Sequence, residues 1–113
     1  MSGDNPMGLP PEDYEELMKE YKDSIKSQIE EIATSINNLQ NSKSKEDLEH
    51  VRLLVHKMAG SSGTYGFQEA SDTCRSLEGD LVKLIEAFDA SQLEEAFFEK
   101  LKTDLTLIEK QFR

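Results

Sequence analysis

The middle of the chain, residues 48–67, reads LEHVRLLVHKMAGSSGTYGF. On a helical wheel with about 100° per residue, its apolar side chains gather on one face. These side chains are Leu48, Val51, Leu54, Val55, Met58 and Tyr65. His56 lies on the other side of the wheel, roughly 140° from Val51. The segment therefore predicts an amphipathic helix that buries one face in a core and presents one imidazole to solvent.

Two glycines lie on the same side of this predicted helix as the histidine. Gly60 and Gly63 are within about 40° of His56 on the wheel, one and two turns further along. Each glycine inside a helix costs roughly 1 kcal/mol relative to alanine, so a bare surface here indicates some gain. We expect that gain to be room for another molecule to reach the imidazole. The alternative is a surface histidine without a task, next to a fraying helix end.

The region before this helix predicts one long amphipathic helix. Pro10 and Pro11, followed by two acidic residues, are typical of a helix start. Apolar residues then recur at spacings of three and four up to Leu39. The asparagine-rich residues 37–43 predict the end of this helix and a polar loop. Ser44 with Asp47 predicts the capping pair of the next helix.

Two more helices follow the central segment. Gly66 is expected in the left-handed conformation that closes the second helix. The third helix is expected from Gln68, and Gly79 within it would permit close approach of a neighbouring helix. A break follows at residues 89–91, where Ser91 and Glu94 predict another capping pair. The apolar positions of the last helix are Leu93, Phe97, Leu101, Leu105, Ile108 and Phe112.

This pattern predicts an all-α fold, an antiparallel four-helix bundle with a flexible N-terminal tail. The tail is expected at residues 1–9, where little can pack, and the bundle at residues 10–113. Heptad-like stripes would also permit a coiled-coil oligomer. Loop signals about every 25 residues favour packing within one chain, hence a monomer.

The composition of the chain indicates which classes of partner it can bind and in which compartment it is expected. The chain has 13 basic and 23 acidic residues, a net charge of −10, which argues against binding nucleic acid or an anionic membrane surface. A single cysteine, Cys74, excludes an internal disulfide and is expected in the core. The sequence shows neither an apolar run of about 20 residues nor a signal-peptide pattern. These features favour a reduced, cytoplasmic protein.

The run from His56 to Gly66 resembles the signature of histidine-containing phosphotransfer (HPt) domains. That signature has a histidine, a Lys-Gly pair three and four residues later, and glycines at seven and ten. Gly60, Gly63 and Gly66 match it. Downstream, Cys74 and the pair Leu77-Glu78 fall where such domains commonly carry a cysteine and a Leu-Glu pair. The resemblance covers about residues 48–81, and the helical pattern fits the rest.

The resemblance implies that His56 accepts a phosphoryl group from a receiver domain's aspartyl phosphate and passes it to another receiver. The implied partners are response-regulator receiver domains and a hybrid sensor kinase, with Mg²⁺ on the receiver and no cofactor on this chain. Glu78 is the candidate acceptor that would hold one ring nitrogen, and the less favoured alternative for it is a solvated surface carboxylate. The sequence lacks a nucleotide-binding pattern, so we expect a phosphoryl carrier and not an enzyme.

One position departs from the signature, since Ala59 stands where the family usually has lysine. The resemblance implies that this lysine offers positive charge to the phosphoryl group. We expect Arg52, one turn before His56, to replace it in part, and Lys57 to be the weaker substitute. Leu53, on the outer face, is the candidate contact for a docking receiver, with Gly60 and Gly63 leaving space beside it.

The sequence also allows two functions other than the relay. With Ala59, the domain could act as an adaptor or phosphate sink that binds receivers with weak transfer or none. A metalloenzyme is disfavoured because His50 and His56 are about 240° apart on the helix and cannot share a metal on one face.

Overall fold

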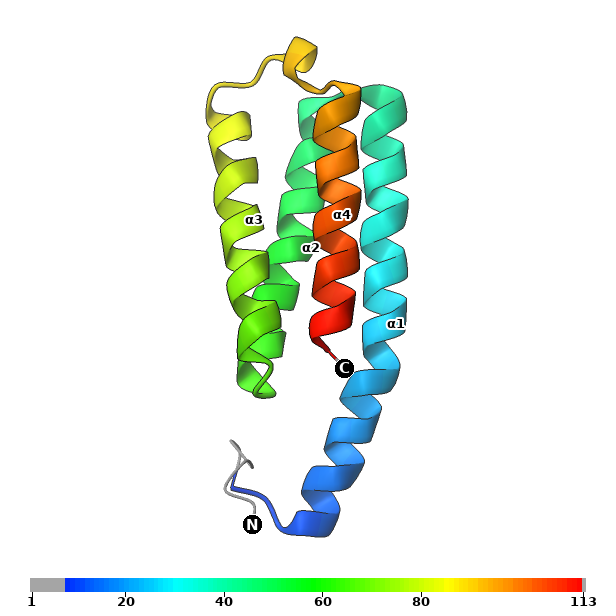
Figure 1. The fold of residues 1–113 in the computed structure, drawn as a ribbon, viewed down its shortest axis with the longest axis vertical. Helices are drawn as coiled ribbons and strands as arrows, with labels where there is room; N and C mark the ends of the chain where they lie inside the picture. Colours follow the sequence, from blue (N-terminus) through cyan, green and yellow to red (C-terminus); the bar gives the residue numbers. More distant parts are fainter. Residues whose placement is uncertain (1–7, 113) are drawn as a thin grey trace.

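The structure is a computed structural model that describes residues 8–112. It contains α1 (Pro11–Ser42), α2 (Lys45–Thr64), α3 (Gln68–Glu86), a short 3₁₀ turn η1 (Ala90–Gln92) and α4 (Glu95–Gln111). Consecutive helices run in opposite directions, α2 packing on α1 and α3, and α4 on α1 and α3 (Figure 1). The predicted all-α four-helix bundle is confirmed. Most of the predicted tail, residues 1–7, lies outside the described residues.

The first helix ends within the region that the sequence predicts for its end, at the far side of that region. It begins at Pro11 with acidic residues in its first turn, as expected, and it continues to Ser42, so residues 37–42, which are expected to form part of a polar loop, are helical. The reason is that Asn37, Asn38 and Asn41 lie on the exposed side of the helix, while its apolar side stays buried. The helix ends at Lys43, which adopts a left-handed φ of 51°.

Local hydrogen bonds set the other helix boundaries. The Ser44 hydroxyl accepts the backbone N–H of Asp47 at 3.1 Å, so the predicted cap of α2 is confirmed. Gly66 has a φ of 89°, the left-handed conformation predicted for it. The predicted Ser91–Glu94 cap is wrong. Asp89 instead accepts the backbone N–H of Ser91 at 3.0 Å and starts η1. It also accepts the Ser91 hydroxyl at 2.8 Å, and the two hydrogen bonds lower the pKa of Asp89.

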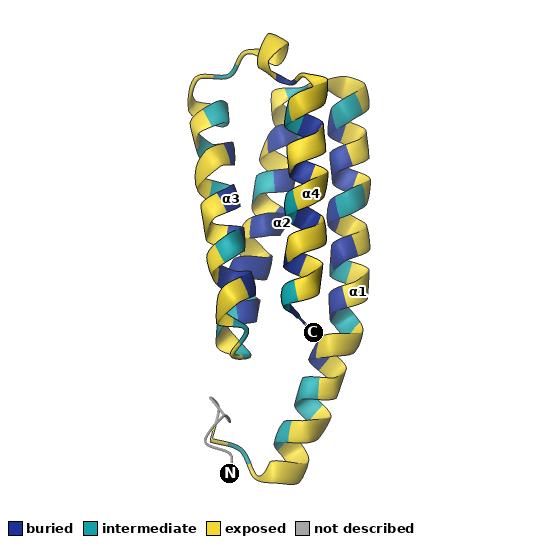
Figure 2. Ribbon diagram, viewed as in Figure 1, coloured by how far each residue is buried: buried dark blue, intermediate teal, exposed yellow. Residues whose placement is uncertain are grey.

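Each helix buries one stripe in a shared core, visible as the inward-facing dark positions in Figure 2. Cys74 is fully buried, as predicted, and burial raises the pKa of its thiol to about 12. In α4 the buried aromatic residue is Phe98, whereas the predicted Phe97 is only half-buried. The core members of α4 are Phe98, Leu101, Leu105 and Ile108.

Aromatic rings from three distant segments meet where α2 turns into α3. The rings of Tyr21 and Tyr65 stack with centroids 3.9 Å apart and planes 6° from parallel. Phe67 and Phe112 lie beside them, with centroids 5.0 Å apart. The Tyr21 hydroxyl also lies 3.0 Å from the Ser61 hydroxyl. This aromatic cluster joins α1, the α2–α3 turn and the end of α4.

The first helix projects beyond the other three. The molecule measures 51 × 21 × 20 Å, and its long dimension is close to the length of the 32-residue α1, about 48 Å at 1.5 Å per residue. Its N-terminal turns extend past the α2–α3 turn (Figure 1). Among the described residues, each helix is too polar or too short to cross a lipid bilayer.

Candidate functional site

His56 projects from the middle of α2 into solvent. Its side chain is 61% exposed, as the helical wheel predicts. The Nδ1 atom lies 3.1 Å from Oε1 and 3.0 Å from Oε2 of Glu78, which projects from the facing turn of α3. The structure therefore brings together the histidine and the carboxylate that the sequence singles out.

Arg52 binds the same carboxylate. Its Nη1 donates to Oε2 of Glu78 at 3.0 Å, and both side chains are partly shielded from solvent, at 30% and 19% exposure. Arg52, His56 and Glu78 thus form one cluster, which we call the His–Glu–Arg cluster. Arg52 joins the site as predicted, but its charge lies beside Glu78 on the Nδ1 side of the ring.

The contact with Glu78 fixes the tautomer of the imidazole. An ionised carboxylate only accepts hydrogen bonds, so the neutral ring must carry its proton on Nδ1. Nε2 then holds a free lone pair, and among the described residues it has no hydrogen-bond partner. An exposed ring nitrogen with an available lone pair, opposite a nitrogen held by a carboxylate, can act as a nucleophile.

The two glycines beside His56 differ in their surroundings. A Cβ on Gly60 would meet no atom within 4 Å, so this position is open, as expected. A Cβ on Gly63 would lie 3.2 Å from the Ser71 hydroxyl. The expectation that Gly63 leaves open surface is therefore wrong, because α3 occupies that space. Gly79, for which close helix packing is predicted, is instead open, with no atom within 4 Å.

Ser71 is a contact residue that the sequence analysis missed. It is fully buried, and its hydroxyl donates to the carbonyl oxygen of Ala59 at 2.8 Å. Ala59, the position of the usual lysine, is itself only 3% exposed beneath α3. The spacing of Ser71, three residues before Cys74, places it on the buried face of α3, and this spacing could have indicated a contact with α2.

The remaining predicted residues lie on the side of α2 that faces away from α3. Leu53 is 37% exposed and therefore available for contact, as predicted. Lys57 lines a small hollow between α1 and α2, together with Gln28 and Glu31 of α1. The structure does not bring Lys57 to the His–Glu–Arg cluster. This agrees with its rank as the weaker candidate.

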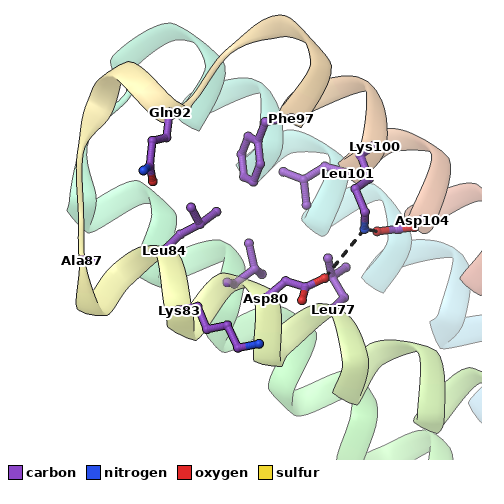
Figure 3. Close-up of a pocket in the computed structure, with 11 residues that line it drawn as sticks. Leu77, Asp80, Lys83, Leu84, Ala87, Gln92, Phe97, Lys100, Leu101 and Asp104 are labelled. Carbon is purple, nitrogen blue, oxygen red and sulfur yellow. Dashed lines mark hydrogen bonds and ion pairs between the residues drawn. The ribbon is translucent and has the colours of Figure 1, made fainter.

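A separate groove of about 440 Å³ lies between α3 and α4 (Figure 3). Leucines and Phe97 line its apolar wall, and Lys100 lies 2.8 Å from Asp104 and 3.8 Å from Asp80 at its edge. None of its lining residues comes from α2, so it is distinct from the surface around His56. Within residues 8–112, no group of three or more His, Cys, Asp or Glu side chains is placed to hold a metal ion.

Comparison with known proteins bears on this arrangement. The sequence matches the Hpt domain family over residues 16–111, which runs from within α1 to the end of α4. No curated protein and no solved structure matches the chain. The family match spans the bundle and includes the helix with the exposed imidazole, and it shows that the chain belongs to the Hpt domain family, whose members take part in histidine phosphotransfer within phosphorelays.

Proposed function

We propose that His56 is the phosphoryl-accepting residue of a phosphorelay, taking the group from one receiver domain and passing it to another. The observation that carries this proposal is the orientation of the ring. Nδ1 is held by Glu78 at 3.0–3.1 Å, while Nε2 points away from it on a side chain that is 61% exposed. A receiver's aspartyl phosphate can approach this nitrogen from solvent.

In the proposed step, the Nε2 lone pair attacks the phosphorus of the receiver's aspartyl phosphate. The N–P bond forms as the acyl phosphate P–O bond breaks, and the bonding electrons return to the aspartate as a carboxylate. The imidazole becomes positively charged, and the Nδ1–H hydrogen bond to Glu78 stabilises that charge. Transfer to the second receiver runs the same step in reverse. The work of the carrier is positioning, since little other chemistry is required.

The receivers would supply the acidic pocket and the Mg²⁺, so this chain needs no cofactor of its own in the proposal. A hybrid sensor kinase would feed the relay, and the chain would act as a monomer in the cytoplasm. Leu53, exposed beside His56, and the open surface at Gly60 favour docking of a receiver on this side of α2. The domain is a carrier in this scheme, because phosphoryl groups enter and leave on receivers.

Incubation with a phosphorylated receiver tests the proposal. We expect acid-labile phosphate on His56, located by mass spectrometry, and loss of labelling in His56→Gln. Because His56 is exposed, this variant is expected to fold normally, which circular dichroism checks. A receiver that binds tightly without labelling His56 would refute the relay. It would support the adaptor that the alanine at position 59 suggests.

A further inference from the structure

A second arginine lies on the surface that carries His56, outside the His–Glu–Arg cluster. Arg75 is exposed on α3, three residues before Glu78. Its Nη2 lies 3.8 Å from the position that a Cβ on Gly63 would occupy, so the guanidinium rests over that glycine. Among residues 8–112 Arg75 has no ion-pair partner. Its charge is therefore available to a ligand.

Two contacts between α2 and α3 fix the level of Arg75 relative to the histidine. Near the start of α3, the Ser71 hydroxyl donates to the carbonyl of Ala59 at 2.8 Å. Further along α3, Glu78 accepts from His56. Because the helices are antiparallel and Arg75 lies about one turn from each contact, it is level with the turn of α2 that begins at His56. From this level the long Arg75 side chain can extend along α2 toward Gly63 in one direction or toward His56 in the other.

The His–Glu–Arg cluster leaves a phosphoryl group without a cation. The positive charge of Arg52 is paired with Glu78 on the Nδ1 side of the ring, whereas phosphorus would bond to Nε2. Lys57 faces α1, and position 59 carries alanine. Phosphoryl transfer depends on neutralising the charge of the transferred group. The planar fork of a guanidinium matches phosphate oxygens well.

We propose that Arg75 swings from its resting place over Gly63 to the phosphoryl group on Nε2 of His56 and binds it there. This inference rests on the proposed function, and in it Arg75 supplies the positive charge that the family's lysine would offer to the phosphoryl group. The motion requires only a change of side-chain rotamer, which exposed side chains make within picoseconds to nanoseconds. Gly63 supports the resting position, since a Cβ there would already contact Nη2 of Arg75 at 3.8 Å and a longer side chain would compete with the guanidinium for space.

Labelling with phosphoramidate tests the role of Arg75 without requiring a receiver to dock. Phosphorus bonds to Nε2 of His56 as the N–P bond of the donor breaks and its protonated nitrogen leaves as ammonia. We expect Arg75→Gln to be labelled about tenfold more slowly than wild type, because a charge-assisted hydrogen bond is lost. Arg75→Lys should restore most of the rate. Lys83→Gln, which removes a positive charge elsewhere on α3, should be labelled at the wild-type rate.

Phosphorus NMR of the phosphohistidine gives a second readout that a merely structural role would not move. A guanidinium beside the phosphoryl group favours its dianion, so the titration midpoint should move to higher pH in Arg75→Gln. Unchanged labelling and an unchanged midpoint would overturn the role of Arg75 and leave His56 as the acceptor. Equal slowing in Lys83→Gln would also overturn it, as a general charge effect. If neither phosphoramidate nor a phosphorylated receiver labels wild-type His56, the proposed function fails as well.

Discussion

Three glycines of the helices that flank the proposed site have different physical environments, although their cost to helix stability is the same in principle. Gly60 and Gly79 face open space, where a side chain would meet nothing. Gly63 faces the hydroxyl of Ser71 and the guanidinium of Arg75. Substitution should therefore separate a glycine that leaves surface free from one that allows two helices to approach.

We expect Gly60→Ala and Gly79→Ala each to raise the free energy of unfolding by about 0.5–1 kcal/mol, because alanine is the better helix former and both positions are open. Gly63→Ala should bring no gain or a loss, since its Cβ would press on Ser71, whose hydroxyl is held by Ala59. Denaturant unfolding of the three variants measures this. Equal stabilisation by all three would contradict the assigned contact at Gly63.

Glu78 should control the reactivity of His56 by holding its Nδ1–H. We expect Glu78→Ala to slow phosphotransfer from a receiver by about tenfold, because the ring loses the acceptor that fixes its tautomer. Glu78→Gln should be less impaired, since its amide oxygen can still accept from Nδ1. Asp80→Asn, an exposed carboxylate loss on the same helix, serves as the control. A wild-type rate of phosphotransfer in Glu78→Ala would show that the carboxylate does not affect the reactivity of His56.

At the scale of whole elements, the helices are held at their ends by side chains that the sequence identifies only in part. The predicted Ser44 cap is present, whereas the predicted Ser91 cap is replaced by Asp89 and a 3₁₀ turn. Both predictions used the same local signal, a serine three residues before an acidic residue. The signal fails at Ser91 because a carboxylate two residues earlier takes the serine's own N–H first.

The two serines give a matched test of this difference. Ser44→Ala should lower the free energy of unfolding by about 1 kcal/mol, because the first turn of α2 loses the acceptor for the N–H of Asp47. Ser91→Ala should have little effect on stability, since Asp89 still accepts the backbone N–H at that position. Thermal or denaturant unfolding compares them. A larger loss from Ser91→Ala would contradict the assignment of the caps.

Periodicity is sufficient to predict the four helices and the exposed imidazole, because it acts on residues close in sequence. The carboxylate partner of His56 lies 22 residues further along the chain and is predicted only through the resemblance. The sequence does not predict which side of α2 faces α3. For that reason the roles of Gly63 and Gly79 are exchanged relative to expectation, and Ser71 and Arg75 escape notice. Such contacts depend on the relative level of two helices, which single-helix patterns do not contain.

At the scale of the whole molecule, one buried thiol links global stability to pH. Burial raises the pKa of Cys74 from its ordinary 9.0 to about 12. In the unfolded chain the thiol ionises near the ordinary value, so the unfolded state releases its proton first as the pH rises. The stabilising effect of the neutral thiol is therefore complete below about pH 9 and is lost between about pH 9 and 12.

We expect the difference in unfolding free energy between wild type and Cys74→Ala to shrink as the pH rises from about 8 to about 11, by roughly 1 kcal/mol or more. Tyr21, whose pKa is raised mainly by burial and to a smaller extent by Cys74, titrates in both proteins, so only its smaller contribution from Cys74 enters the difference. Denaturant unfolding at several pH values provides the comparison. A difference that stays constant with pH would mean that the thiol is accessible to water in the folded state.

The stacked rings of the aromatic cluster have a practical consequence. The chain contains no tryptophan, so its ultraviolet emission comes from three phenols, two of which are Tyr21 and Tyr65. These two chromophores report on a single junction, where the first helix meets the α2–α3 turn beside the last helix. Intrinsic fluorescence of the unlabelled protein should therefore follow the opening and closing of that junction directly.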